Sequence, residues 1–219
     1  MKKLLLIIFL ATAGTLFAQA DLPENTPALI NEAQYLLKED PTSLEGRKLL
    51  RIALESEPNN EQANYLLANS HLTAGASHIV KGYISKAITA NPENIDYRWI
   101  RARCNLTSAA SMEDFAQAIR DLQFMAENGA GTAKVYANLA LAERELAREW
   151  KYKTVPANKT WTDDKSKQET IATTNLKEAL THYEKAKAAA TKAIELEPEY
   201  SAKISVQGIE QEIETLNNK

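Results

Sequence analysis

Ala53-Leu54-Glu55-Ser56-Glu57-Pro58-Asn59-Asn60 is followed, 34 residues further along the chain, by the similar stretch Ala87-Ile88-Thr89-Ala90-Asn91-Pro92-Glu93-Asn94. A third copy, Ala193-Ile194-Glu195-Leu196-Glu197-Pro198-Glu199-Tyr200, begins 106 residues after the second, which is three such periods and four residues more. A fixed period of this size is typical of a solenoid, in which each unit buries its apolar face against its neighbour. The sequence therefore predicts a stack of similar units.

Turn-forming residues divide each period into two helices. Thr26-Pro27 is a typical helix start, with a capping hydroxyl and a proline in the first turn, and Asp40-Pro41 ends that helix. Thr42 has the capping-box spacing to Glu45 and predicts the start of a second helix, which ends before Pro58. Alternation of the kind found in strands is scarce, so we expect an all-α protein.

The later units differ in length but keep this pattern. Ser111 to Asp114 resembles a capping box, and the helix predicted from near residue 164 to Pro198 is about 30 residues long, beyond the usual three or four turns. The predicted fold is an α-solenoid of stacked helical hairpins with a C-terminal capping helix that covers the open end. The predicted segments are units at about 27–60, 61–94, 95–132 and 133–198, an insertion at 153–164 within the fourth, and a capping helix at about 201–217.

The first twenty residues are expected to be a signal peptide rather than part of the fold. Lys2 and Lys3 precede the mostly apolar run from Leu4 to Phe17, and Ala18-Gln19-Ala20 supplies small residues for cleavage before Asp21. A membrane anchor is the alternative, but the run is shorter than the roughly 20 apolar residues that a spanning helix needs. The protein is therefore predicted to be exported, either periplasmic or secreted.

Composition narrows the possible partners and the sources of stability. Cys104 is the only cysteine, so an exported chain has no internal disulfide, and no cysteine stands at the cleavage point to carry a lipid anchor. Loss of the two leader lysines reduces the 26 basic residues to 24 against 29 acidic ones, so the formal charge moves from −3 to −5. Because basic and acidic residues are interleaved, nucleic acid is not expected as a partner.

These residues resemble the tetratricopeptide repeat (TPR) family, whose 34-residue unit is a helix pair with small residues where the helices cross and a proline after the second helix. Four positions depart from the family pattern: Val80 stands where a smaller residue is usual, His71 replaces an aromatic, Ala130 replaces the third proline, and Arg103 follows the small position of the third unit. The matching positions are Ala33, Leu37, Gly46, Leu50, Ala53 and Pro58 in the first unit, Leu67, Ala68, Ile84, Ala87 and Pro92 in the second, Ala102, Asp114, Phe115, Ala118 and Leu122 in the third, and Tyr136, Leu139, Ala140, Ala186, Ala190, Ala193 and Pro198 in the fourth.

The resemblance implies a concave groove, lined by the first helix of each pair, that holds an extended peptide or a helix of a protein partner. Tyr65 and Trp99 stand one period apart on this surface and are candidate binding anchors, although packing between helices explains either ring equally well. No clamp for a terminal carboxylate is inferred, because Asn31 and Tyr35 stand where its lysine and asparagine are expected. We call the predicted surface the first-helix face: Asn31, Tyr35, Lys38, Gln62, Tyr65, Asn69, Asp96, Trp99, Arg103, Lys134, Leu141 and Arg144.

A second surface is predicted around the insertion. Trp150, Tyr152 and Trp161 lie among lysines there, a combination that suits contact with a membrane or cell wall. The alternative is that Trp150 and Tyr152 pack against the long helix and that the loop only connects, and the mixture of lysines with acids favours this alternative. Contact with an envelope protein through the first-helix face remains the preferred function.

Signals for catalysis are weak. His71 and His78 flank a turn without the spacing of a zinc hydrolase, and a position facing solvent or near a helix cap is expected for them. Ser77 lacks the glycines of a nucleophile elbow and is interpreted as a helix cap, while Cys104 is interpreted as a buried core residue. We therefore predict no enzyme activity, no cofactor and no metal.

Overall fold

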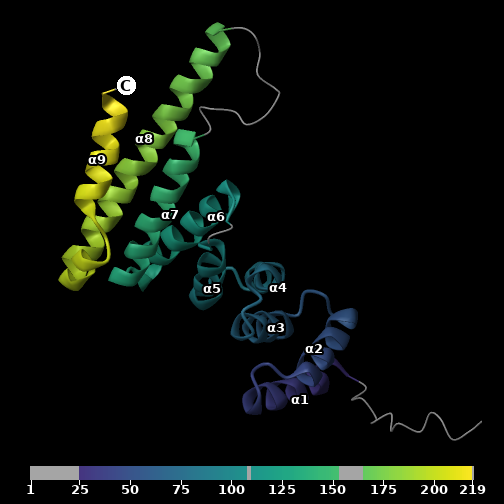
Figure 1. The fold of residues 1–219 in the computed structure, drawn as a ribbon. Coiled ribbons are helices and arrows are strands. Elements are labelled where there is room, and N and C mark those ends of the chain that lie inside the picture. Colours follow the sequence, from purple (N-terminus) through teal and green to yellow (C-terminus); the bar gives the residue numbers. More distant parts are fainter. Residues whose placement is uncertain (1–24, 108–109, 153–164, 219) are drawn as a thin grey trace, which may run out of the picture.

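The computed structural model describes residues 25–107, 110–152 and 165–218, with side chains except at 165–168, and these residues form helices without any strand. Figure 1 shows their order from the N-terminal to the C-terminal end. The elements are α1 (Thr26–Glu39), α2 (Leu44–Ser56), α3 (Glu61–Thr73), α4 (Ser77–Ala90), α5 (Ile95–Asn105), α6 (Met112–Met125), the π-helical turn η1 (Ala126–Ala130), α7 (Ala133–Tyr152), α8 (Lys165–Leu196), the 3-10 turn η2 (Pro198–Ala202) and α9 (Val206–Asn217).

Consecutive helices form hairpins that stack along one axis. α1 pairs with α2, α3 with α4, α5 with α6 and α7 with α8, and α9 lies against α8 at the far end of the stack (Figure 1). Each helix has one apolar stripe, and stacking covers that stripe with the next helix in sequence. The predicted fold class, an all-α solenoid with a C-terminal capping helix, is confirmed.

Small residues let the paired helices approach closely. Ala53, Ala87 and Ala193, the alanines of the repeated stretch, are fully buried on the second helices of their hairpins. Gly46 on α2 also allows a close approach, because a Cβ atom there would lie 3.0 Å from Cγ of Leu37 on α1 and would force that side chain to shift. The small positions of the repeat are thus explained by the short distance between helix axes.

Helix starts follow side-chain caps, but the predicted caps of the first two helices are wrong. Asn25 rather than Thr26 caps α1, and its Oδ1 accepts from the backbone N–H of Ala28 at 2.9 Å. Ser43 rather than Thr42 caps α2. The hydroxyl of Thr42 donates instead to Oδ1 of Asp40 at 2.8 Å in the preceding turn, so it is not available for the helix.

The predicted cap at Ser77 is also wrong. Ser77 is the first residue of α4, and Ala76 takes the cap position without a side-chain hydrogen bond. Gly75, with a φ of 75°, adopts the left-handed conformation that ends α3. The turn between these two helices therefore depends on its glycine rather than on the serine hydroxyl.

The predicted capping box at the start of α6 is confirmed. The hydroxyl of Ser111 accepts from the backbone N–H of Asp114 at 3.2 Å, and the Asp114 carboxylate accepts from the backbone N–H of Ser111 at 2.9 Å. Lys81 on α4 adds an ion pair to the same carboxylate at 2.6 Å. These hydrogen bonds outweigh partial burial and lower the pKa of Asp114 below its usual value.

A buried carboxylate links α5 to α6. Asp121 on α6 is fully buried and receives Arg101 through two nitrogens, at 2.8 and 2.7 Å, and Arg98 at 3.2 Å. Arg98 also lies 3.7 Å from the ring centre of Phe124. The interleaved charges of this part of the sequence are therefore not all on the surface.

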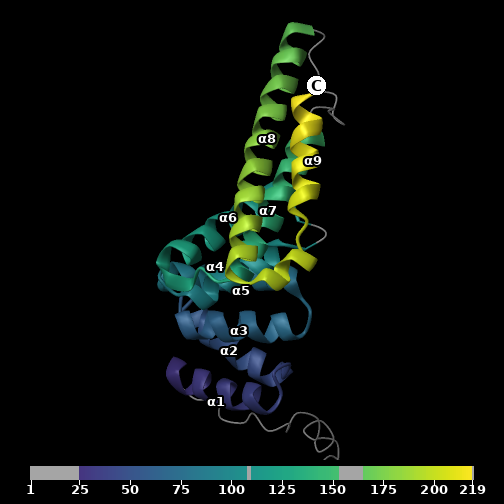
Figure 2. The same ribbon diagram turned by 90° about the vertical axis from the view of Figure 1, so that its left-hand side faces the viewer.

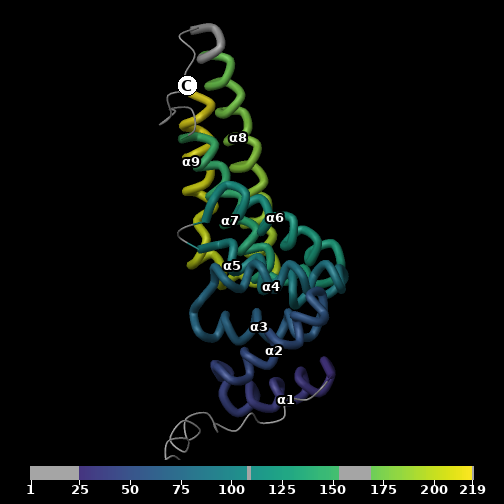
Figure 3. Tube along the Cα trace, turned by 90° about the vertical axis from the view of Figure 1, so that its right-hand side faces the viewer, coloured from purple at the N-terminus to yellow at the C-terminus, as the bar shows by residue number. Residues whose placement is uncertain are grey.

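The last hairpin is much longer than the others. α7 has 20 residues and α8 has 32, and Figures 2 and 3 show from opposite sides that both rise beyond the shorter hairpins with α9 beside them. Ion pairs hold α9 in place: Lys151 on α7 meets Glu212 at 2.7 Å, and Lys187 on α8 meets Glu210 at 2.8 Å. No helix in the described ranges combines the length and the apolar content that a membrane span requires.

The apolar core is divided along the stack. One cluster joins α1, α2 and α3 around Leu50 and Leu67, and a second joins α3, α4 and α5 around Ile84. The third and largest cluster joins α5 to α9 around Leu122 and Tyr183. The two small clusters thus each join one N-terminal hairpin to a helix of a neighbouring hairpin, whereas the C-terminal half shares one large cluster.

Candidate functional site

The first-helix face lies on α1, α3, α5 and α7, the first helices of the four hairpins. Nine of its twelve residues are exposed, and Tyr65, Trp99 and Arg144 are half-buried. Four of its charged residues are cations and one, Asp96, is an anion, although the chain as a whole carries a net negative charge. The face is therefore more basic than the rest of the molecule.

The N-terminal part of the face borders a small hollow between α1 and α3. Lys38 and Asn69 line it together with Gln34, Leu37, Pro41, Leu66 and Ser70, and its volume is about 170 Å³. Gln62, also on the face, donates to Oε1 of Gln34 at 2.9 Å. A hydrogen bond from Ser70 to the carbonyl oxygen of Pro41, at 2.7 Å, fixes the far wall.

The two aromatic rings of the face each contact the next first helix. Tyr65 on α3 packs against Tyr97 on α5 with 4.9 Å between ring centres, and Lys134 on α7 lies 4.9 Å from the ring centre of Trp99 on α5. The Tyr97 hydroxyl donates to Glu61 at 2.9 Å, and burial raises the pKa of Tyr97 above its usual value. Each ring therefore has a packing contact and also keeps an exposed part.

The C-terminal part of the face opens into a pocket of about 240 Å³ that we call the α7 pocket. One wall belongs to α7 and includes the predicted residues Leu141 and Arg144, and the other belongs to the segment from η2 to α9. The lining residues are Ala137, Asn138, Ala140, Leu141, Arg144, Tyr200, Lys203, Ile204 and Ile209. The sequence predicted only a capping helix at about 201–217 in this segment, and no signal in it placed the turn after α8 across α7.

The charged groups of the α7 pocket come from both walls. Arg144 lies 3.2 Å from Oε1 of Glu145, and the same oxygen accepts from Arg148 at 2.9 Å. On the opposite wall, Lys203 lies 4.6 Å from the ring centre of Tyr200. One carboxylate shared by two guanidinium groups leaves a positive charge uncompensated at this end of the face.

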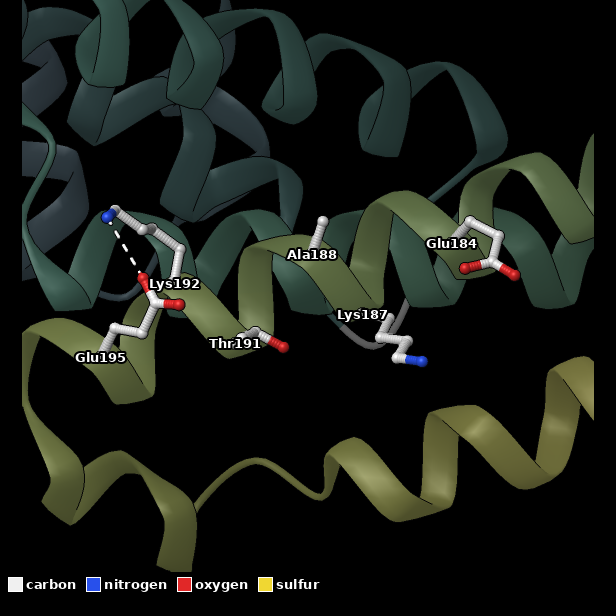
Figure 4. Close-up of a pocket in the computed structure, with 6 residues that line it drawn as sticks. All are labelled: Glu184, Lys187, Ala188, Thr191, Lys192 and Glu195. Carbon is white, nitrogen blue, oxygen red and sulfur yellow. Dashed lines mark hydrogen bonds and ion pairs between the residues drawn. The ribbon is translucent and has the colours of Figure 1, made fainter.

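A more open hollow on α8 lies apart from the predicted face. Figure 4 shows that Glu184, Lys187, Ala188, Thr191, Lys192 and Glu195 all come from this one helix, with an ion pair of 3.2 Å between Lys192 and Glu195. These residues occupy the helix side opposite the buried Ala186, Ala190 and Ala193. A strip on a single helix without a second wall offers no enclosure, so it is a weaker candidate than the α7 pocket.

The second predicted surface is only partly described. Trp150 is half-buried and packs against the large C-terminal core, whereas Tyr152 is 70% exposed at the end of α7. Trp161 and the insertion lie outside the described residues. Packing therefore accounts for Trp150 and does not account for Tyr152.

Groups that could perform chemistry are dispersed. No three His, Cys, Asp or Glu side chains gather as a metal site within the described ranges. His71 is 7% exposed and its ring stacks 5.9 Å from that of Tyr83, so of its two expected positions the one near a helix cap is found, in the last turn of α3, and the one facing solvent is not. His182 on α8 lies 2.5 Å from the buried Glu143 on α7 and joins the long hairpin. The predicted burial of Cys104 is confirmed.

Comparison with known proteins identifies the fold. No protein-family model and no curated protein matches the sequence. Among solved structures, a MamA RS-1 ArsTM double mutant is similar over 90% of this chain and 95% of its own, with 13% sequence identity and a TM-score of 0.52. The chain has the fold of MamA.

Two further structures are similar at lower scores. MamA AMB-1 covers 74% of this chain and 71% of its own, with 17% identity and a TM-score of 0.48. A thermophilic TPR protein from Thermus thermophilus covers 89% of this chain and 100% of its own, with 14% identity and a TM-score of 0.41. Of these three structures, MamA RS-1 has a TM-score above 0.5. At such low sequence identity this likeness concerns the fold alone. The likeness supports the predicted fold of stacked helical hairpins.

Proposed function

We propose that this protein is an exported, non-enzymatic scaffold whose first-helix face binds a peptide or a helix of another envelope protein. The observation that carries the proposal is the α7 pocket, an apolar cavity that lies on this face beside exposed polar side chains. A groove with a few apolar anchor positions and a polar rim is the usual form of a surface that binds an extended segment.

The polarity of the face supports a protein ligand of complementary charge. Lys38, Arg103 and Lys134 are exposed on three different first helices, so an acidic segment that crosses the stack meets a cation on each of them. Tyr65 and Trp99 lie between these cations and offer apolar contact area. The export part of the proposal rests on the leader, which precedes the described residues.

Site-specific photo-crosslinking in the native envelope tests this function. A crosslinker at Asn69 or Arg103, both exposed on the face, is expected to capture one partner, whereas a crosslinker at the exposed Lys185 on α8 is expected not to capture it. The captured protein is then purified, and its affinity for the unmodified chain is measured by calorimetry.

A double variant separates binding from packing. Tyr65→Ala with Trp99→Ala is expected to abolish capture and to leave the helical circular dichroism almost unchanged. Equal capture from Asn69 and Lys185, or undiminished capture by the double variant, contradicts the proposed site. Global loss of helicity in the double variant would instead assign the two rings to packing, and binding is then tested with Asn69→Ala and Arg103→Ala.

A second function has one observation in its favour, the exposure of Tyr152 at the end of α7 next to the insertion. In this alternative, the protein is a surface-associated accessory protein that contacts the membrane or cell wall. Flotation with vesicles of anionic and neutral phospholipid tests the lipid contact. Flotation that depends on Tyr152 and Trp161 supports the alternative, and its absence leaves the scaffold as the better account.

A further inference from the structure

We propose that the α7 pocket holds one apolar side chain of the partner and that acidic side chains on both sides of this residue pair with Arg144 and Lys203. This inference rests on the proposed scaffold function and adds the chemistry of the segment that is bound. The partner segment is therefore an internal, acidic stretch with a leucine-like anchor, and not a generic peptide.

The volume of the pocket sets the size of the group. Cavities that bind small molecules measure roughly 300–1,000 Å³, and the α7 pocket, at about 240 Å³, is smaller. It is large enough for a single side chain. A cofactor or nucleotide is too large for it.

The walls of the pocket match an aliphatic group. Leu141 faces Ile204 and Ile209 across the pocket, and Ala137 and Ala140 form the small residues of the α7 wall. Leu141 is 37% exposed, so part of its apolar surface faces the pocket opening and water. An aliphatic side chain in the pocket would cover this apolar surface and remove it from water.

The charged residues that line the pocket are both cations. Arg144 and Lys203 line it from opposite walls, and no acidic residue is among the lining residues in the described part of the chain. Glu145, beside the pocket, is shared with Arg148 and cannot neutralise Arg144 fully. Nε of Arg144 is also buried without a hydrogen-bond partner in the described ranges, so this guanidinium is incompletely paired.

The position of the two cations favours acidic side chains over a single terminal carboxylate. A chain end supplies a single carboxylate to be shared between the walls, whereas acidic residues on both sides of the anchor give Arg144 and Lys203 a carboxylate each. Lys134 on α7 and Arg103 on α5 are further exposed cations of the first-helix face. An acidic segment that continues along this face can pair with them as well.

Short peptides test the proposal directly. The probe is Glu-Asp-Leu-Asp-Glu, acetylated and amidated so that only its side chains carry charge, added to the mature chain with labelled leucine and isoleucine methyl groups. We expect NMR shifts at the methyl groups of Leu141, Ile204 and Ile209. Three control peptides are used. In the first, serine replaces the leucine, and in the second, amides replace all the acids. The third has no acidic side chain and ends in leucine with a free carboxylate.

Protein variants identify the groups responsible. Arg144→Met and Lys203→Met keep an unbranched apolar stem and remove the charge, and each is expected to weaken binding of the probe about tenfold, the usual effect of losing a hydrogen bond to a charged group. Ala137→Phe is expected to fill the pocket and to abolish the methyl shifts. Lys185→Met, the matched loss of an exposed cation on α8, should leave the affinity unchanged, and thermal melts verify that all variants are folded.

Each outcome decides the proposal. Shifts with the acidic leucine peptide alone support it. Equal binding of the amide peptide shows a purely apolar pocket and overturns it, as does binding of only the peptide with the free carboxylate, or no binding of any peptide. Capture of a partner through Asn69 and Arg103 that persists in the Arg144→Met, Lys203→Met double variant retains the scaffold and rejects this anchor. Peptide binding without any partner capture supports the anchor pocket and rejects the scaffold function.

Discussion

His71 shows how a single residue in this solenoid links stability to pH. It is buried against the ring of Tyr83, and burial, followed by the charges of Arg47, Arg51 and His78, lowers its pKa below the usual value of about 6.5. The folded chain therefore resists protonation of this imidazole, while the unfolded chain accepts the proton. Stability from this residue is fully present above pH of about 6.5 and decreases as the pH falls through that value.

We expect the His71→Phe variant to keep the ring stacking and to lose this dependence. Urea unfolding between about pH 8 and pH 5 is the measurement, because the aspartates with lowered pKa values, such as Asp114, titrate below this window. The free energy of unfolding of the unmodified chain should fall more steeply toward pH 5 than that of the variant. Parallel curves for the two proteins would show that His71 is not responsible.

Cys104 carries the second prediction at the residue scale. Its side chain is buried on α5, and burial raises the pKa of the thiol above its usual value, so little thiolate forms at neutral pH. We expect a thiol reagent to modify it slowly in the folded protein and rapidly in denaturant. The extent of modification is measured by mass spectrometry. Rapid modification of the native chain would contradict the assignment of Cys104 as a core residue.

At the scale of the element, the joint between α5 and α6 depends on one carboxylate. Asp121 is 0% exposed and is held by Arg98 and Arg101, which are themselves mostly buried. Asp121→Asn leaves both guanidinium groups without their counter-ion, and loss of one partner of a buried pair costs about 3–5 kcal/mol. Chemical denaturation should show a loss of this size. Glu113→Gln, which removes a partner of the exposed Arg120 on the same helix, should change stability by less than about 1 kcal/mol.

The crossings inside the hairpins give a further prediction. Ala87 on α4 and Ala193 on α8 are fully buried where the helices are closest. Replacing either by leucine adds atoms to a filled space and should cost about 1–3 kcal/mol, measured as a lower melting temperature. Leucine at the exposed Ala90 or Ala188 is the control and should leave the melting temperature nearly unchanged. An unchanged melt for both buried variants would contradict the repeat alignment.

The elements were predictable to the extent that local signals fix them. Prolines such as Pro58 and the repeated alanines mark hairpin ends and crossings, because both act within one turn of helix or at one contact. The caps of α1 and α2 were misassigned, because Thr42 had two possible partners and only the turn geometry shows that it bonds to Asp40. The buried role of Asp121 was missed for a similar reason, since its two arginines lie 20 and 23 residues earlier in the sequence.

At the scale of the whole molecule, α9 is what ends the stack. Ile209, Ile213 and Leu216 cover the last apolar surface of α7 and α8. Ile209→Glu places a charge in that contact and should detach α9, so that the exposed end associates with other copies. We expect a lower melting temperature and a mass that rises with concentration in light scattering. Gln211→Glu, on the exposed side of α9, is the control, and a monomeric, unchanged Ile209→Glu variant would show that the cap is dispensable.

Of the candidate site, only the part on the first helices of the hairpins was predictable from the sequence. The periodicity of the chain places the first-helix face on α1, α3, α5 and α7, because each residue of a repeat takes the same position in its unit. The opposite wall of the α7 pocket was not predictable, since Tyr200 and Lys203 reach it through a 3-10 turn whose direction is set by tertiary packing. The repeat pattern of the sequence therefore cannot predict a pocket that lies between the last repeat and the capping helix.

The division of the apolar core makes the two ends of the molecule differ in their resistance to unfolding by force. Two small clusters hold the helices from α1 to α5, while α5 to α9 share one large cluster. A force that pulls the two chain ends apart therefore meets little resistance at α1 and α2 and strong resistance beyond α5. Under such a force the protein unfolds one hairpin at a time from its N-terminal end. The α7 pocket lies in the part that unfolds last.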